Sequence, residues 1–172
     1  MSERKVFKVI IVGEGNVGKT TLVRSYVDQI LVRNTIPTIG VDLSTKIIPD
    51  EGPGKQLQIW DLGGQPHLRF VAQIFFRGAS GMIAVFDVTR RQSLTELDGW
   101  IQRVYQVTGQ IPSVIVGNKI DLRASANENG SCVTREEGNE FALKHGAPYF
   151  ETSAIEGSGI EEAFTTLAGK LD

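Results

Sequence analysis

A glycine-rich segment that ends in a lysine and a threonine is the most informative stretch of the sequence. It reads Gly13-Glu14-Gly15-Asn16-Val17-Gly18-Lys19-Thr20 and matches the pattern G-x-x-x-x-G-K-[ST] at every fixed position. Glycines let backbone N–H groups turn inward around phosphate oxygens, and a following helix N-terminus adds partial positive charge. Lys19 supplies a point charge for the terminal phosphates, and the Thr20 hydroxyl can ligate Mg²⁺. The segment therefore predicts a loop that binds a nucleoside triphosphate.

The same glycines also satisfy the dinucleotide-binding spacing G-x-G-x-x-G. That interpretation is disfavoured because Lys19 and Thr20 follow directly. It also needs an acidic strand end near residue 35, and none is present. A triphosphate remains the better match.

A second polar segment, Asp61-Leu62-Gly63-Gly64-Gln65, follows a predicted strand over residues 57–60. An acidic residue at a strand end can hold Mg²⁺ directly or through its water. Gly64 would let a backbone N–H approach a γ-phosphate, and Gln65 can orient an attacking water. Alone the pattern is typical of many loops, but together with the phosphate loop it indicates phosphoryl chemistry.

A third segment, Asn118-Lys119-Ile120-Asp121, follows a predicted strand over residues 114–117 and predicts the base. The N1–H and N2 amino groups of guanine present two parallel donors, which one carboxylate can accept. Adenine instead presents an acceptor at N1, which would face the Asp121 carboxylate. A P-loop kinase or ATPase, the competing interpretation, would have no use for this segment and would need an arginine-rich lid.

Alternating strands and helices must position these segments. The apolar run from Val6 to Val12 is typical of a strand covered on both faces. A helical pattern follows from Leu22 to Ile30. Val41, Leu43, Thr45 and Ile47 share one face of an extended stretch, as do Leu57 and Ile59, and residues 49–54 between them read as a hairpin loop. Further apolar strands are predicted at residues 81–87, 112–117 and 148–152.

Each of the last three strands precedes a helix with a predicted capping box, in which two side chains satisfy free N–H groups at the helix start. The pairs are Ser93 with Glu96, Thr134 with Glu137 and Ser158 with Glu161. Strands that alternate with helices require a parallel sheet with right-handed crossovers. We expect an α/β fold: a doubly wound, mostly parallel six-stranded sheet, one antiparallel edge strand and about five helices. In such sheets ligands bind at the carboxyl ends of the strands.

Composition excludes several classes of protein. A chain of 172 residues predicts one domain, residues 1–172. One cysteine favours a reducing compartment, so we expect a cytoplasmic protein. A net charge of -2 provides no footprint for nucleic acid. The apolar runs are too short to span a bilayer, and neither end carries a secretory, myristoylation or prenylation signal, so membrane contact is not expected.

With these motifs the chain resembles the Ras superfamily of small GTPases, from about residue 5 to residue 171. The resemblance implies a P-loop NTPase of the G-domain type: a monomeric GTPase that binds GTP and GDP with Mg²⁺ and slowly hydrolyses GTP. Two switch loops would contact effector proteins, an exchange factor and a GTPase-activating protein. Pro37-Thr38-Ile39-Gly40 looks like the first switch, in which Thr38 ligates Mg²⁺ and senses the γ-phosphate. Glu151-Thr152-Ser153-Ala154 looks like the loop whose Ala154 N–H meets the guanine oxygen.

Subgroup features are mixed. Residues 75–81 and 151–154 resemble Rab proteins, whereas residues 61–66, in which Pro66 follows Gln65, look more like the Arf group. Leu31 stands where the family often has an aromatic ring on the guanine face, and Thr35 replaces a frequent tyrosine. Because Pro66 replaces the usual acidic residue, a GTP-binding module with negligible hydrolysis, regulated by exchange alone, is the alternative.

The expected site follows residue by residue. Catalysis is assigned to Gln65, Lys19 and Thr38, with a further arginine expected from a partner rather than from Arg69 or Arg77. The metal ligands are Thr20, Thr38 and Asp61. The nucleotide is expected to contact Gly13, Glu14, Gly15, Asn16, Val17, Gly18, Lys19, Thr20, Thr21, Leu31, Thr35, Thr38, Gly64, Asn118, Lys119, Asp121, Leu122, Ser153 and Ala154.

Overall fold

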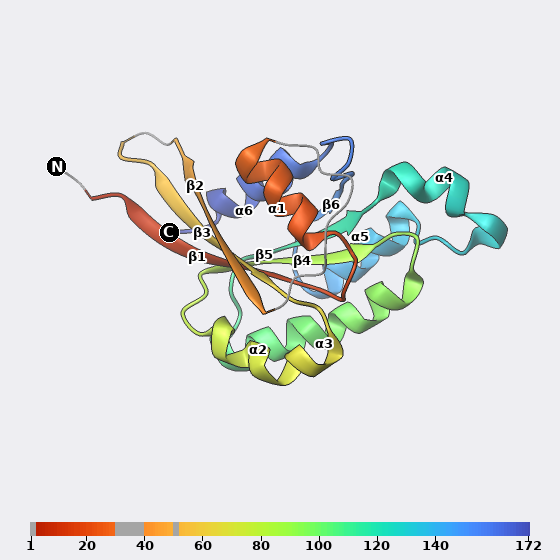
Figure 1. The fold of residues 1–172 in the computed structure, drawn as a ribbon, viewed down its shortest axis with the longest axis horizontal. Helices are drawn as coiled ribbons and strands as arrows, with labels where there is room; N and C mark the ends of the chain where they lie inside the picture. Colours follow the sequence, from red (N-terminus) through yellow and green to blue (C-terminus); the bar gives the residue numbers. More distant parts are fainter. Residues whose placement is uncertain (1–2, 30–39, 50–51) are drawn as a thin grey trace.

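One six-stranded mixed sheet forms the centre of the protein (Figure 1). The computed structural model describes residues 3–29, 40–49 and 52–172. The strands are β1 (Lys5–Val12), β2 (Val41–Ile48), β3 (Lys55–Leu62), β4 (Gly81–Asp87), β5 (Ser113–Asn118) and β6 (Tyr149–Glu151). Their spatial order is β2-β3-β1-β4-β5-β6, and only the β2–β3 pair is antiparallel. The predicted parallel sheet with one antiparallel edge strand is confirmed.

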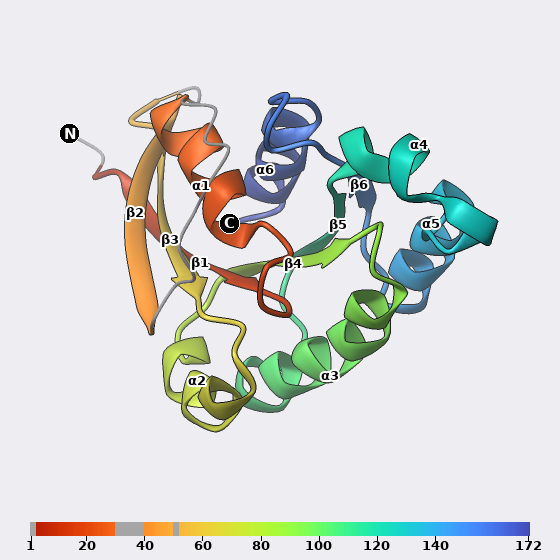
Figure 2. The same ribbon diagram turned by 45° about the vertical axis from the view of Figure 1, so that its right-hand side comes forward.

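Helices cover both faces of this sheet, as Figure 2 shows most clearly. They are α1 (Lys19–Asp28), α2 (Arg69–Phe76), α3 (Arg91–Thr108), α4 (Arg123–Ala126), α5 (Arg135–Lys144) and α6 (Ile160–Gly169). Three short 3-10 turns, η1 (Pro66–Leu68), η2 (Ile120–Leu122) and η3 (Glu128–Gly130), complete the described elements. The described part of the chain therefore holds six α-helices where about five were expected. Neither α2 nor the short α4 was located from the sequence.

Strand β1 shows why the sheet is covered twice. Val9 and Ile11 lie in an apolar cluster with α1 and α6, whereas Ile10 and Val12 lie in a second cluster with α2, α3 and α5. All four side chains are fully buried. Neighbouring residues of a strand point to opposite faces, so a continuous apolar run needs two covered faces.

Only one of the three predicted capping boxes forms. Thr134 and Glu137 exchange the two capping hydrogen bonds at the start of α5. Ser93 lies inside α3, and its Oγ donates to the Arg90 carbonyl instead, because α3 already begins at Arg91. Helix α6 has Gly159 as its N-cap, so the Ser158 prediction is also wrong.

The N-cap of α6 has to be a glycine for a steric reason. Gly159 has φ +76°, and an added Cβ would lie 2.2 Å from the Glu151 carbonyl oxygen. Ser158 forms two backbone hydrogen bonds with Ser153 rather than capping the helix. The glycine therefore brings α6 close to the end of β6.

Strand β3 differs from prediction in a way that bears on the site. It continues to Leu62, so Asp61 lies within the strand rather than in a following loop. On β2, the face that carries Val41, Leu43 and Ile47 is largely exposed: Leu43 is 54% and Ile47 49% exposed, whereas Val41 packs against the second apolar cluster. The other face of this edge strand, which includes Ile48, packs against the core.

Of the helices formed by described residues, none is long and apolar enough to cross a membrane.

Candidate functional site

The polar segments predicted from the sequence meet at the carboxyl ends of the parallel strands. The sheet register places Asp61 of β3 beside Ile11 of β1, and Asn118 of β5 beside Asp87 of β4. The phosphate loop follows β1 and enters α1 at Lys19. This is the edge at which doubly wound sheets bind their ligands.

Side-chain hydrogen bonds hold five carbonyl groups of the phosphate loop. The carbonyls of Gly13 and Glu14 accept hydrogen bonds from Lys19 Nζ (2.9 and 2.7 Å), that of Gly15 from Arg90 Nη2 (2.8 Å), that of Asn16 from Lys119 Nζ (2.6 Å) and that of Val17 from Asn118 Nδ2 (2.9 Å). In a trans peptide the N–H points away from the C=O. The N–H groups of Asn16, Val17 and Gly18 therefore point away from the outside donors Arg90, Lys119 and Asn118, an arrangement that can bind an anion.

Two glycines of the loop are required by close contacts. Gly13 has φ +148°, and an added Cβ would lie 2.2 Å from the Val85 carbonyl oxygen. Gly18 has φ +99°, and its Cβ would lie 2.3 Å from Asn118 Nδ2. The second contact joins the phosphate loop directly to the predicted base-binding segment.

Lys19 is a buried cation at the centre of the loop. Its side chain is 6% exposed, and burial lowers its pKa to about 8. The carboxylates of Asp61 and Glu14 oppose that shift, whereas Arg90 adds to it. Lys19 is thus a charge that lacks water, and an anionic phosphate placed in the loop would stabilise its protonated form.

Thr20 and Asp61 lie together beside Lys19. The Thr20 hydroxyl donates a 2.5 Å hydrogen bond to Asp61 Oδ2, and Asp61 is 2% exposed. A hydroxyl and a carboxylate are oxygen ligands that suit Mg²⁺, which proteins commonly bind through one or two carboxylates together with substrate phosphates. The described residues contain no cluster of three or more His, Cys, Asp or Glu side chains that would form an all-protein metal site.

The segment after β3 packs against the phosphate loop. A Cβ on Gly64 would lie 2.3 Å from the Gly15 nitrogen and 2.4 Å from the Glu14 carbonyl carbon, so the two backbones are in direct contact. Next to it, Gln65 Oε1 is buried and has no hydrogen-bond partner among the described residues. This acceptor is available to bind a water molecule.

Asn118 connects the phosphate loop to the segment after β6. Besides its bond to Val17, the Asn118 Oδ1 atom accepts hydrogen bonds from Thr152 Oγ1 (2.9 Å) and the Ala154 N–H (3.3 Å). Asp121 Oδ1 accepts a 2.8 Å hydrogen bond from Ser153 Oγ. The two segments assigned to the base, residues 118–121 and 151–154, are therefore brought together.

An ion-pair cluster supports that second segment. Arg123 donates to both oxygens of Glu151 (2.9 and 2.5 Å), and the Tyr149 hydroxyl donates to Oε1 (3.0 Å). Burial alone would raise the pKa of Glu151, but the hydrogen bonds and charge of Arg123 outweigh it and leave the pKa below the ordinary value. The cluster fixes Glu151 at the start of the loop that carries Ser153 and Ala154.

Sequence reasoning missed three residues that shape the site. Asp87 lies 3.2 Å from Lys119 Nζ, Arg90 holds the Gly15 carbonyl, and Trp100 donates from Nε1 to Glu14 Oε1 at 2.9 Å. Asp87 ends a strand, and that position was a signal available in the sequence. Arg90 and Trp100 carried none, because they lie in or beside a helix far along the chain.

Not every predicted contact lies in the described structure. Leu31, Thr35 and Thr38 lie outside the described residues. Thr21 is buried in α1, and Leu122 is 41% exposed beside Asp121. The remaining predicted contacts belong to the four segments described above: the phosphate loop, the segment after β3, residues 118–121 and residues 151–154.

Comparisons with known proteins agree with this geometry. A family model described as the Ras family matches residues 8–172. A Ras-related protein of rice (Oryza sativa subsp. japonica), RIC1, is 34% identical to this chain over 167 residues, which cover 96% of this chain and 80% of the relative.

Proposed function

The chain belongs to the Ras family and so is a switch protein that binds and hydrolyses GTP. We propose that it holds Mg²⁺ beside the nucleotide and that two switch loops transmit the nucleotide state to partner proteins. The hydrogen bonds that Arg90, Lys119 and Asn118 make to the Gly15, Asn16 and Val17 carbonyls carry this proposal. They leave the N–H groups of residues 16–18 pointing the other way, next to a loop that also holds the buried cation of Lys19.

Mg²⁺ is assigned to Thr20 and Asp61, with Thr38 from the first switch as the third ligand. The hydrogen bond between the Thr20 hydroxyl and the Asp61 carboxylate supports this assignment, because it brings two oxygen ligands together at the phosphate loop. The ion would neutralise charge on the β- and γ-phosphates. Lys19 supplies a second positive charge from the protein.

Hydrolysis is assigned to Gln65 as the residue that orients water, with the Gly64 N–H directed at the γ-phosphate. The buried Oε1 of Gln65 and the contact of Gly64 with the phosphate loop support these roles. Catalysis is then mostly positioning and charge stabilisation. An activating partner would supply the arginine.

Guanine is assigned to Asp121, Lys119, Ser153 and the Ala154 N–H. The hydrogen bond from Ser153 to Asp121 supports this assignment because it holds the carboxylate beside the loop that carries Ala154. One carboxylate oriented in this way can accept from both N1–H and the N2 amino group of guanine.

Two measurements test the proposal. Nucleotide extracted from the purified protein should be GDP or GTP, and an adenine nucleotide would contradict the base assignment. Single-turnover hydrolysis of GTP should be measurable with Mg²⁺ and fall to near zero when the ion is chelated. Hydrolysis at the same rate without Mg²⁺ would overturn the metal assignment. No hydrolysis in either condition would favour the exchange-only alternative, for which Pro66 at the start of η1 is the supporting observation.

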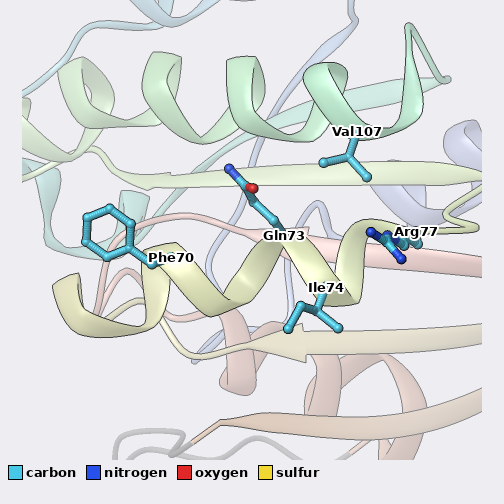
Figure 3. A pocket seen from close by; sticks show the side chains of 5 residues that line it. All are labelled: Phe70, Gln73, Ile74, Arg77 and Val107. Carbon is cyan, nitrogen blue, oxygen red and sulfur yellow. The ribbon is translucent and has the colours of Figure 1, made fainter.

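Partners are proposed to dock on the surface formed by α2 and the outer face of β2. Within the family we propose that the chain is Rab-like and binds effector proteins of the kind that Rab proteins bind. Phe70 is 88% exposed and Ile74 66% exposed, and both line a pocket with Gln73, Arg77 and Val107 between α2 and α3 (Figure 3). Contiguous exposed apolar side chains mark interaction surfaces. Partner-stimulated hydrolysis should fall in Ile74→Ser while the unstimulated rate stays the same. An unchanged stimulated rate would contradict this surface.

A monomeric state and a cytoplasmic location complete the proposal. The isolated protein should elute and scatter light as one copy of 18.8 kDa, and a stable dimer would contradict the first part. Cell fractionation should recover the chain with cytoplasmic proteins, and recovery with membranes would contradict the second.

A further inference from the structure

The outer side of the phosphate loop is attached to α3 at two adjacent residues. Trp100 Nε1 donates a 2.9 Å hydrogen bond to the side chain of Glu14, and Arg90 at the N-cap of α3 donates a 2.8 Å hydrogen bond to the Gly15 carbonyl. Trp100 lies 86 residues after Glu14 in the sequence, and Arg90 lies 75 residues after Gly15. The loop is thus attached to a helix as well as to the base-binding segment.

Trp100 provides a rigid end to this attachment. Its side chain is fully buried in the cluster that α3 forms with the sheet. Glu14 lies between Gly13 and Gly15, so the adjacent backbone is conformationally permissive. A charged hydrogen bond to an immobile indole restricts the loop at the point where its own backbone restricts it least.

The Glu14 carboxylate is otherwise an unfavourable group at this position. It is close enough to Lys19 to act on that cation, since it opposes the lowering of the Lys19 pKa. A negative charge so placed repels phosphate. The hydrogen bond to Trp100 gives the carboxylate a compensating role, because it directs the group toward α3 and fixes the loop.

We propose that Glu14 is a positioning residue whose side chain, held by the Trp100 indole N–H, keeps the phosphate loop in its binding conformation and slows nucleotide release. The proposal rests on the nucleotide binding that membership of the Ras family establishes. It assigns to α3 a direct influence on the lifetime of the bound state.

The test compares release of a fluorescent GDP from variants of the full chain. Trp100→Phe removes the donor but keeps an aromatic ring, and Glu14→Ala removes the acceptor. Each should release GDP about tenfold faster than the unmodified protein, the scale expected for one charge-assisted hydrogen bond. Glu14→Gln keeps an acceptor oxygen for Trp100 but loses the charge, so its release should be slower than that of Glu14→Ala, and release as fast as that of Glu14→Ala would contradict a role for the hydrogen bond.

Tyr105→Phe is the matched control for general weakening of α3. Tyr105 is also in α3, and its hydroxyl forms a 3.0 Å hydrogen bond with Ser113 Oγ, away from the phosphate loop. This variant should release GDP at the unmodified rate even if its unfolding midpoint falls as far as that of Trp100→Phe. Equal acceleration in both would show that helix stability, not the Glu14 contact, sets release, and would overturn the proposal.

Coupling and fluorescence give two further criteria. The double variant Trp100→Phe/Glu14→Ala should release GDP no faster than either single variant, and multiplied effects would contradict a shared hydrogen bond. The chain has two tryptophans, so Trp60→Phe leaves Trp100 as the sole tryptophan, which is excited selectively at wavelengths that tyrosine does not absorb. Adding Glu14→Ala should then change the Trp100 emission, and an identical spectrum would overturn the contact. If the unmodified protein itself held no GDP, nucleotide binding would be refuted, separately from this proposal.

Discussion

Gly64 allows a test of how closely the two loops must fit. Its missing Cβ would lie 2.3 Å from the Gly15 nitrogen and 2.4 Å from the Glu14 carbonyl carbon. These are backbone atoms, and side-chain hydrogen bonds hold both carbonyls of that stretch, so the phosphate loop has little freedom to move away. Gly64→Ala should therefore displace the segment that carries Gln65.

The size of the effect follows from the contact distances. An ordinary van der Waals contact of a Cβ is 3.4–4 Å, so the methyl group added by Gly64→Ala needs a displacement of roughly 1 Å. A misplacement of about 1 Å can cost about 10² in rate, which corresponds to about 2.7 kcal/mol of barrier. We expect single-turnover GTP hydrolysis to slow by about that factor, with GDP affinity within about threefold, because the phosphate loop keeps its own hydrogen bonds.

Gly99→Ala is the control, because it adds the same Cβ inside α3, where the nearest atom, Arg103 Nη1, would be 3.7 Å away. It should hydrolyse GTP at the unmodified rate. Gly64→Ala with unchanged hydrolysis would show that the site tolerates a displacement of about 1 Å in this segment. That result would refute the assignment of Gln65 and Gly64 to the reaction.

Four other predictions follow from single groups. Asp121→Asn should weaken GDP binding tenfold or more, because a buried donor pair of guanine costs about 1–3 kcal/mol when unpaired, and should improve relative affinity for xanthine nucleotides; equal GDP affinity by titration would contradict it. Gln65→Leu should leave GTP affinity nearly unchanged and slow single-turnover hydrolysis, alone and with an activating partner, because the glutamine acts mainly in the transition state; a wild-type rate would remove its role. Leu31→Phe should slow fluorescent-GDP release by roughly two- to tenfold through stacking on the base, and an unchanged off-rate would place residue 31 elsewhere. Because the pKa of Glu151 is lowered in the folded protein, its ionised carboxylate stabilises the fold above the ordinary pKa of 4.5, and this contribution is lost as pH falls through the folded pKa. The free energy of unfolding in urea should therefore fall less between pH 6 and pH 3.5 for Glu151→Gln than for the unmodified protein, and an equal fall in both would contradict this prediction.

Local patterns in the sequence predicted much of the fold. The continuous apolar run of β1 indicated a doubly covered strand, and the structure buries Val9 to Val12 on both faces. On β2 the same reasoning placed Leu43 and Ile47 on one face but did not indicate that both point to solvent. Alternation identifies a face but not the side on which the core lies, and for an edge strand that side is decided by neighbours that the pattern does not contain.

Residue types at the candidate site could be predicted from the sequence, but the contacts between them could not. Lys19, Thr20, Asp61 and Asn118 were predicted because phosphate, Mg²⁺ and guanine chemistry restrict which residue types can stand at those positions, and the structure brings these residues to one end of the sheet. Ser93 shows the opposite case: its pattern matched a capping box, yet the hydroxyl bonds to the Arg90 carbonyl. Contacts such as this depend on where a helix begins relative to the preceding strand, which short motifs do not determine.

The hydrogen bonds to the Asn16 and Val17 carbonyls can form only late in the synthesis of the chain. Their donors, Lys119 and Asn118, come 103 and 101 residues later in the chain. A ribosome that adds about 5–20 residues per second needs roughly 5–20 s to reach them. A nascent chain therefore displays the complete glycine-rich motif long before it can close the loop around a phosphate, and nucleotide captured on the ribosome would report that β5 has joined the sheet.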